Sequence, residues 1–85
     1  MVPVVIYTRA YCSYCTWAKE LLRRKGAAFE EIDVTGHPER RAEMIRRTGG
    51  QTTTPQVFIG STHVGGCDEL YALERAGGLD ALLAA

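Results

Sequence analysis

The strongest structural signal in the chain is the stretch Val4-Val5-Ile6-Tyr7-Thr8-Arg9-Ala10-Tyr11-Cys12-Ser13-Tyr14-Cys15. Its first four residues are apolar and mostly β-branched, which predicts a buried strand over residues 4–7. A loop at residues 9–11 then leads to two cysteines separated by two residues. From about residue 13 to residue 25 apolar side chains recur at helical spacing, and Gly26 follows as a helix stop. The stretch therefore predicts a strand, a loop that carries a cysteine pair, and a helix.

The rest of the chain is predicted to contain three more strands and three more helices. In chain order they are a strand ending near residue 33, a helix from about residue 38 to before residue 49, a strand over 56–59, a strand over 62–64, a helix over 67–76 and a short closing helix after 78. In the helix that follows residue 38 we expect Ala42, Met44 and Ile45 to face inward while the arginines stay exposed. We expect His63 to occupy a solvent-facing strand position.

The order of these elements predicts the architecture. A βαβ unit requires parallel strands with a right-handed crossover, and the later hairpin adds antiparallel strands to the same sheet. We therefore expect one α/β domain, residues 1–85, with a four-stranded mixed sheet flanked by three to four helices. A CxxC pair beside a βαβ unit is typical of the thioredoxin-like fold.

The composition disfavours several classes of protein. Ten basic and ten acidic side chains cancel, so no net field attracts nucleic acid or an anionic membrane. No stretch approaches the roughly 20 apolar residues of a membrane span, and the first residues lack the pattern of a signal peptide. Three cysteines are too few for a disulfide framework. We expect a protein of the reducing cytoplasm, with neither a nucleic-acid nor a membrane partner.

The two paired cysteines are predicted to differ in reactivity. Cys12 lies at the start of the first helix, where free N–H groups and the helix dipole stabilise an anion. The thiolate is the form that attacks disulfides, and Arg9 and Lys19 add positive charge nearby. Cys15 lies one turn further into the helix and is expected to be buried. We therefore predict that Cys12 is the nucleophile and that Cys15 resolves the mixed disulfide.

A structural zinc site is the alternative use of such a pair. Cys67 and His63 would have to supply the third and fourth ligands. The chain contains no second CxxC and no HxxxH to act as the usual partner pair. Redox chemistry is therefore favoured, and no metal is expected.

Three segments together resemble the active site of the glutaredoxin family: Tyr11-Cys12-Ser13-Tyr14-Cys15, Thr53-Thr54-Pro55 and Gly65-Gly66-Cys67-Asp68. Each is weak alone, but the three in this order are specific, and the likeness to short bacterial members runs over nearly the whole chain. The resemblance implies a glutathione-dependent oxidoreductase that reduces protein disulfides and glutathione mixed disulfides. Its partners would be glutathione, disulfide-bearing or glutathionylated client proteins and, indirectly, glutathione reductase.

The resemblance also implies a glutathione site. Pro55 would be cis, although the pattern alone suggests a trans turn, and the backbone of Thr54 would pair with extended glutathione. The helix start at Cys67 and Asp68 would bind the γ-glutamyl carboxylate, although Asp68 is equally suited to cap that helix. For the glycine carboxylate the candidates are Arg9 and Gln51. The implied glutathione-binding residues are Arg9, Tyr14, Gln51, Thr54, Pro55, Gly66, Cys67 and Asp68.

Two positions depart from the family pattern. Ser13 stands where proline is common, and some family members with serine there bind a [2Fe–2S] cluster between two monomers through thiols like Cys12 and two glutathiones. A cluster-bridged dimer is therefore the alternative to a monomeric enzyme. Thr54 stands where valine is usual, which is expected to matter little if backbone atoms make the contacts. Thioredoxin proper fits less well, because its motif has tryptophan before the first cysteine and Gly-Pro between the pair.

Overall fold

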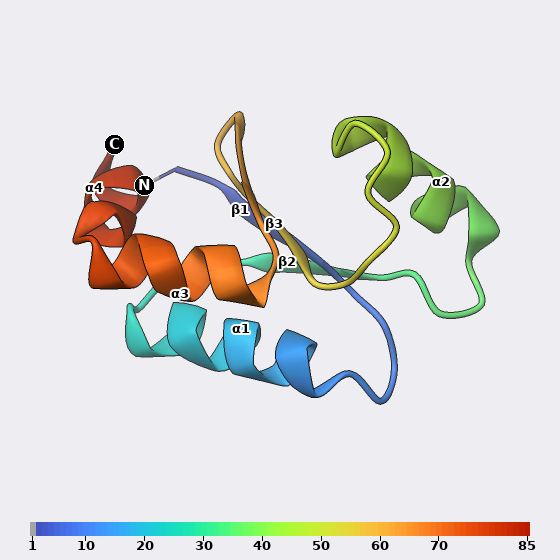
Figure 1. Cartoon of the computed structure of the whole chain (residues 1–85), viewed down its shortest axis with the longest axis horizontal. Helices are drawn as coiled ribbons and strands as arrows, with labels where there is room; N and C mark the ends of the chain where they lie inside the picture. The colour runs from blue at the N-terminus through green and yellow to red at the C-terminus, as the bar shows by residue number, and fades with distance from the viewer. Residues whose placement is uncertain (1) are drawn as a thin grey trace.

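The computed structural model describes residues 2–85 and contains four strands and four helices (Figure 1). They are β1 (Val4–Thr8), α1 (Ser13–Arg24), β2 (Glu30–Asp33), α2 (Pro38–Arg47), β3 (Gln56–Ile59), β4 (Thr62–Gly65), α3 (Cys67–Arg75) and α4 (Gly78–Ala84). The sheet has the order β2-β1-β3-β4, with β1 parallel to β2 and antiparallel to β3, and with β4 antiparallel to β3. The predicted mixed sheet of a thioredoxin-like fold is confirmed.

Helices cover both faces of the sheet, and the alternation of side chains along the strands explains how. Successive residues of a strand point to opposite faces. On β1, Val4 and Ile6 belong to a large apolar cluster that includes Leu22 of α1, Leu70 of α3 and Leu79 of α4. Figure 1 shows α1 and α3 side by side on this face.

The opposite face carries a smaller cluster under α2. Tyr7 and Phe58 point to this face and pack with Val34 and Met44. The Tyr7 hydroxyl donates a hydrogen bond to Glu43 and accepts one from Arg47 at 2.9 Å. This face therefore combines apolar packing with a polar network, whereas the main cluster on the α1/α3 face is built from apolar side chains.

Two residues near the second cluster, Ala42 and His63, correct the sequence expectations. Ala42 is exposed, because Met44 is the α2 residue that points at the sheet and is fully buried. The arginines of α2 are exposed, as expected, but the guanidinium of Arg47 also lies 4.2 Å from the centroid of the Phe58 ring. His63 does not face solvent: it is half-buried, stacked on Phe58 with a centroid distance of 4.8 Å.

The predicted element boundaries agree with the structure to within one or two residues. For example, α1 ends at Arg24 because Gly26 adopts a left-handed backbone, with φ of 70°, a conformation that costs glycine little. Within residues 2–85, none of the helices has the length and apolar character needed to cross a membrane.

Candidate active site

Cys12 occupies the N-cap of α1, as predicted. Its backbone is extended, and its sulfur accepts a hydrogen bond from the Cys15 N–H at 3.1 Å. That N–H is one of the donors that a helix start leaves without a backbone partner. The Cys12 side chain is partly exposed, whereas Cys15 is buried with 2% of its surface exposed. One thiol therefore faces the outside and the other faces the core.

The surroundings of Cys12 favour its thiolate. Partial burial of the sulfur is the largest single influence and opposes ionisation, but hydrogen bonds with the Cys15 thiol and the Cys15 backbone N–H favour it. The Thr54 hydroxyl and the charge of Arg9 act in the same direction, so the pKa of Cys12 lies below its ordinary value. The predicted thiolate character of Cys12 is thus supported by the site's geometry.

The surroundings of Cys15 have the opposite effect. Burial first, and then the hydrogen bond with Cys12, raise the pKa of Cys15 to about 11. Cys15 therefore stays protonated near neutral pH and lies next to the sulfur that reacts. It becomes a nucleophile only when it gives up its proton, which suits a resolving thiol better than an attacking one.

The loop before β3 brings a third segment to the sulfur. The Thr54–Pro55 peptide bond is cis, as the family resemblance implied. The carbonyl oxygen and the hydroxyl of Thr54 each lie 3.8 Å from the Cys12 sulfur. The Thr54 side chain therefore has a contact that the sequence did not predict, since its hydroxyl donates a hydrogen bond to the Cys12 sulfur.

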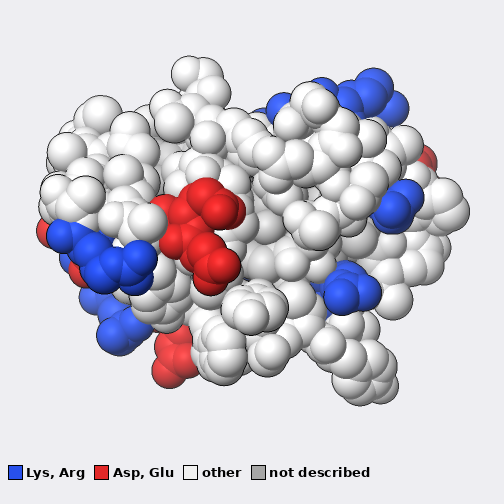
Figure 2. Space-filling view, in the orientation of Figure 1, with Lys and Arg blue, Asp and Glu red and all other residues white. Residues whose placement is uncertain are grey.

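A groove of about 310 Å³ runs from the Thr54–Pro55 corner to the start of α3. Six of the eight residues predicted to bind glutathione line it; they are Tyr14, Thr54, Pro55, Gly66, Cys67 and Asp68. Gly66, at the α3 end of the groove, is the N-cap of α3. Its N–H donates a hydrogen bond to the Glu69 carboxylate at 2.7 Å. Acidic side chains gather over this part of α3 (Figure 2). The helix start thus offers backbone donors beside an exposed carboxylate, that of Asp68.

The other two predicted residues lie outside this groove. Arg9 is exposed in the loop after β1 and lines a separate hollow that also contains Cys12 and Cys15. The side-chain oxygen of Gln51 accepts a hydrogen bond from Gln56 Nε2 at 3.0 Å. The structure therefore brings Arg9, but not Gln51, next to the thiols.

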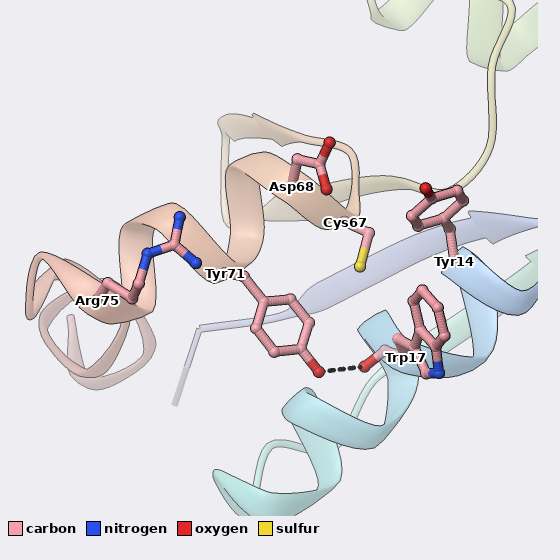
Figure 3. A pocket seen from close by; sticks show the side chains of 6 residues that line it. All are labelled: Tyr14, Trp17, Cys67, Asp68, Tyr71 and Arg75. Atoms are coloured by element: carbon pink, nitrogen blue, oxygen red, sulfur yellow. Dashed lines mark hydrogen bonds between the residues drawn. The ribbon is translucent and has the colours of Figure 1, made fainter.

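A second hollow, of about 490 Å³, adjoins the groove where α1 meets α3 (Figure 3). Tyr14, Cys67 and Asp68 line both, and Trp17 and Tyr71 extend the lining. The Tyr71 hydroxyl donates a hydrogen bond to the Trp17 carbonyl at 3.1 Å, which ties the two helices together. Cys67 is buried, and its raised pKa, caused first by burial and then by the charge of Asp68, keeps it a neutral packing residue.

Sequence reasoning missed one residue that supports the site. Gln56 is 1% exposed, and its Nε2 donates to the Thr53 carbonyl at 3.1 Å and to the Thr53 hydroxyl at 3.3 Å. Its Oε1 lies 2.7 Å from Nε2 of His63. The available signal was a glutamine that opens an otherwise apolar buried strand. Across residues 2–85, no three side chains of His, Cys, Asp or Glu converge in the way a metal ion requires.

A thioredoxin-like fold whose first helix begins at an ionisable cysteine, with a second cysteine one turn later, defines a thiol–disulfide oxidoreductase. The glutaredoxin family model matches residues 4–64, and the chain belongs to the glutaredoxin family. Its active-site pair is Cys12 and Cys15, and the enzyme is a glutathione-dependent oxidoreductase.

Individual glutaredoxins are similar to this chain over nearly its whole length. A glutaredoxin of Pseudomonas aeruginosa is 65% identical over 85 residues and covers 100% of both chains. The solution structure of a Brucella melitensis glutaredoxin is 64% identical, with a TM-score of 0.85 over 98% of this chain and 89% of that one. A buckwheat glutaredoxin–glutathione complex is 35% identical, with a TM-score of 0.88 over 98% of this chain and 77% of that one.

Proposed function

We propose that this glutaredoxin reduces glutathione mixed disulfides and protein disulfides, with Cys12 as the attacking thiolate and Cys15 as the resolving thiol. The observation that carries the proposal is the contrast within the pair. The pKa of Cys12 is lowered at an accessible helix start, while burial and Cys12 raise the pKa of Cys15 to about 11. Only one of the two thiols is therefore ready to attack at neutral pH.

The reaction takes two exchange steps. In the first, the Cys12 thiolate attacks one sulfur of the substrate disulfide, a bond to Cys12 forms, and the other sulfur leaves as a thiolate. In the second, either the Cys15 thiol, after losing its proton, or a glutathione thiolate attacks the mixed disulfide. Attack by Cys15 closes the Cys12–Cys15 disulfide, whereas attack by glutathione on a glutathionylated Cys12 releases oxidised glutathione and the Cys12 thiolate.

Glutathione is proposed to lie in the 310 Å³ groove with its sulfur at Cys12. The backbone of Thr54 would pair with the peptide, and the N–H groups of Cys67 and Asp68 at the start of α3 would bind the γ-glutamyl carboxylate. The Asp68 carboxylate would bind the ammonium group, and the charge of Arg9, or the amide of Gln51, would bind the glycine carboxylate. The glutathione complex of the buckwheat relative supports this proposal.

The working setting is proposed to be a reducing cytoplasm, where glutathione reductase returns oxidised glutathione to its reduced form. The three cysteines of the chain are free thiols, which suits that setting. Client proteins would be disulfide-bearing or glutathionylated, and the enzyme would act as a monomer.

A second candidate is a [2Fe–2S] cluster held between two monomers. It is favoured by Ser13 in the cysteine motif and by Cys12, which is partly exposed while Cys15 and Cys67 are buried. Each chain would then supply one thiolate, and glutathione would supply the others. Visible absorbance of the purified protein together with a dimer in gel filtration would support this candidate, and a colourless monomer would exclude it.

The test of the main proposal is turnover of a small glutathione mixed disulfide, coupled to glutathione reductase and NADPH. Cys12→Ser should abolish turnover, because no other accessible thiol can attack. Cys15→Ser should keep activity with this substrate, because glutathione itself resolves the intermediate. Wild-type protein without turnover, or an active Cys12→Ser variant, would contradict the proposal.

A further inference from the structure

Thr54 presents two different groups to the sulfur of Cys12. Its carbonyl oxygen and its side-chain hydroxyl both lie 3.8 Å from that sulfur, within hydrogen-bond range for sulfur. The residue is held between the buried Pro55 and the loop that Gln56 ties through Thr53. The hydroxyl therefore approaches the sulfur from a segment 42 residues away in the sequence.

The two groups favour opposite protonation states of Cys12. A carbonyl oxygen only accepts hydrogen bonds, so it pairs with the sulfur when the sulfur carries its proton. A hydroxyl can donate, so it pairs with the sulfur as a thiolate, beside the Cys15 N–H at 3.1 Å. Hydrogen bonds to an ionised acceptor are stronger than those between neutral groups. Any residue at position 54 supplies the carbonyl, but the second donor comes from the side chain, and an apolar side chain cannot supply it.

We propose that the hydroxyl of Thr54 is a catalytic group that donates a hydrogen bond to the Cys12 sulfur whenever that sulfur carries negative charge. The proposal rests on the proposed function, in which Cys12 is the attacking thiolate. The hydrogen bond with Thr54 acts to lower the pKa of Cys12, in the same direction as the Cys15 N–H and the charge of Arg9.

The same donor acts in both exchange steps. Before the first step it stabilises the thiolate that attacks the substrate disulfide, and it loses that partner as the new sulfur–sulfur bond forms. In the second step glutathione attacks the glutathione sulfur of the mixed disulfide, the bond to Cys12 breaks, and the electron pair returns to the Cys12 sulfur. The hydroxyl again donates to the departing thiolate, which makes Cys12 a better leaving group.

The test compares Thr54→Val with Thr54→Ser. Valine has nearly the shape of threonine and keeps the carbonyl, but it removes the hydroxyl; serine keeps the hydroxyl. The readout is the rate of iodoacetamide alkylation of Cys12 in the reduced protein from pH 4 to pH 10, followed by peptide mass spectrometry. Thr54→Ala is a second variant without the hydroxyl and reports on any disturbance by the branched valine side chain.

Thr54→Val and Thr54→Ala should both slow alkylation about three- to tenfold at pH values where Cys12 is only partly ionised, because one donor to the thiolate is lost. Thr54→Ser should stay near wild type. All four proteins should converge at high pH, where Cys12 is fully ionised in each; a general distortion of the site would not produce this convergence.

Other outcomes separate this inference from the function on which it rests. If Cys12 of the wild type is ionised near neutral pH but the valine and alanine variants alkylate at the same rate, the role of the hydroxyl is refuted and the proposed function stands. Equal slowing in the serine variant would refute it as well. A wild-type Cys12 that alkylates only at strongly alkaline pH would overturn both.

Discussion

Cys12 and Cys15 are the same residue type in the same helix, three positions apart, yet their surroundings differ in almost every respect. Cys12 is the N-cap of α1 and accepts a backbone N–H that the helix leaves free. Cys15 lies within the helix and is 2% exposed. The pKa of the first is lowered, and burial together with Cys12 raises the pKa of the second to about 11. Position relative to a helix start therefore decides which thiol reacts.

The two thiols share some neighbours, but the balance of influences on their pKa values differs. Cys12 draws its stabilisation from the start of α1, from the loop that carries Thr54 and from Arg9 after β1. For Cys15 burial is the largest influence on the pKa, and it outweighs the hydrogen bonds with the Arg9 backbone and the Thr54 side chain, which act in the opposite direction.

The largest expected effect is the difference in reactivity between the two thiols at pH 7. With a pKa of about 11, only about one Cys15 side chain in ten thousand is ionised at that pH. The pKa of Cys12 lies below its ordinary value, so Cys12 should be alkylated at least about a hundredfold faster than Cys15 in the folded, reduced protein. Peptide mass spectrometry after timed exposure to iodoacetamide measures both rates. In strong denaturant the two alkylation rates should become similar. Similar rates in the folded protein would show that the fold does not make Cys12 more reactive than Cys15.

A second, smaller effect is expected when the loop that supplies Thr54 loses its support. Gln56→Leu leaves the Thr53 carbonyl and the His63 ring without their partner inside the protein. The loss of these hydrogen bonds should lower the free energy of unfolding by about 1–3 kcal/mol, as measured by urea denaturation.

The same variant should slow alkylation of Cys12, whose sulfur contacts Thr54, and leave Cys15 slow as before. Thr62→Val is the matched control: Thr62 is an exposed residue on the neighbouring strand β4, and its replacement should change stability by no more than about 0.5 kcal/mol. If Gln56→Leu behaves like this control, the glutamine does not support the loop.

Much of the thiol region could be predicted from local sequence. A β-branched run, two cysteines with two residues between them and a helical pattern place Cys12 at a helix start by geometry alone, and the structure confirms this. The fold followed from the order of elements, because a βαβ unit and a hairpin leave few ways to build one sheet. The groove residues from three segments needed the family resemblance, since nothing local says that Thr54, Tyr14 and Asp68 meet.

The wrong expectations concern residues whose contacts come from distant elements. The 3.6-residue period did not tell Ala42 from Met44 as the side chain that points at the sheet in a helix as short and arginine-rich as α2. His63 was expected at a solvent-facing position of β4, whereas Phe58 and Gln56 of β3 hold it half-buried. The role of the Thr54 hydroxyl depends on where it lies relative to a sulfur 42 residues earlier, which no local pattern contains.

The smallest expected effect separates charge from hydrogen bonding at Cys12. Arg9 acts on the sulfur only through its charge and is exposed, so water and salt screen it strongly. Arg9→Gln should slow alkylation of Cys12 near neutral pH by less than about twofold at low ionic strength, and the difference should vanish near 1 M salt, where the Debye length is about 3 Å. Arg46→Gln, an exposed α2 arginine, changes the net charge equally and should have no effect. A large loss of alkylation rate in Arg9→Gln that salt does not change would mean that Arg9 bonds the sulfur directly. The view that the helix start and Thr54 contribute most to stabilising the Cys12 thiolate would then be wrong.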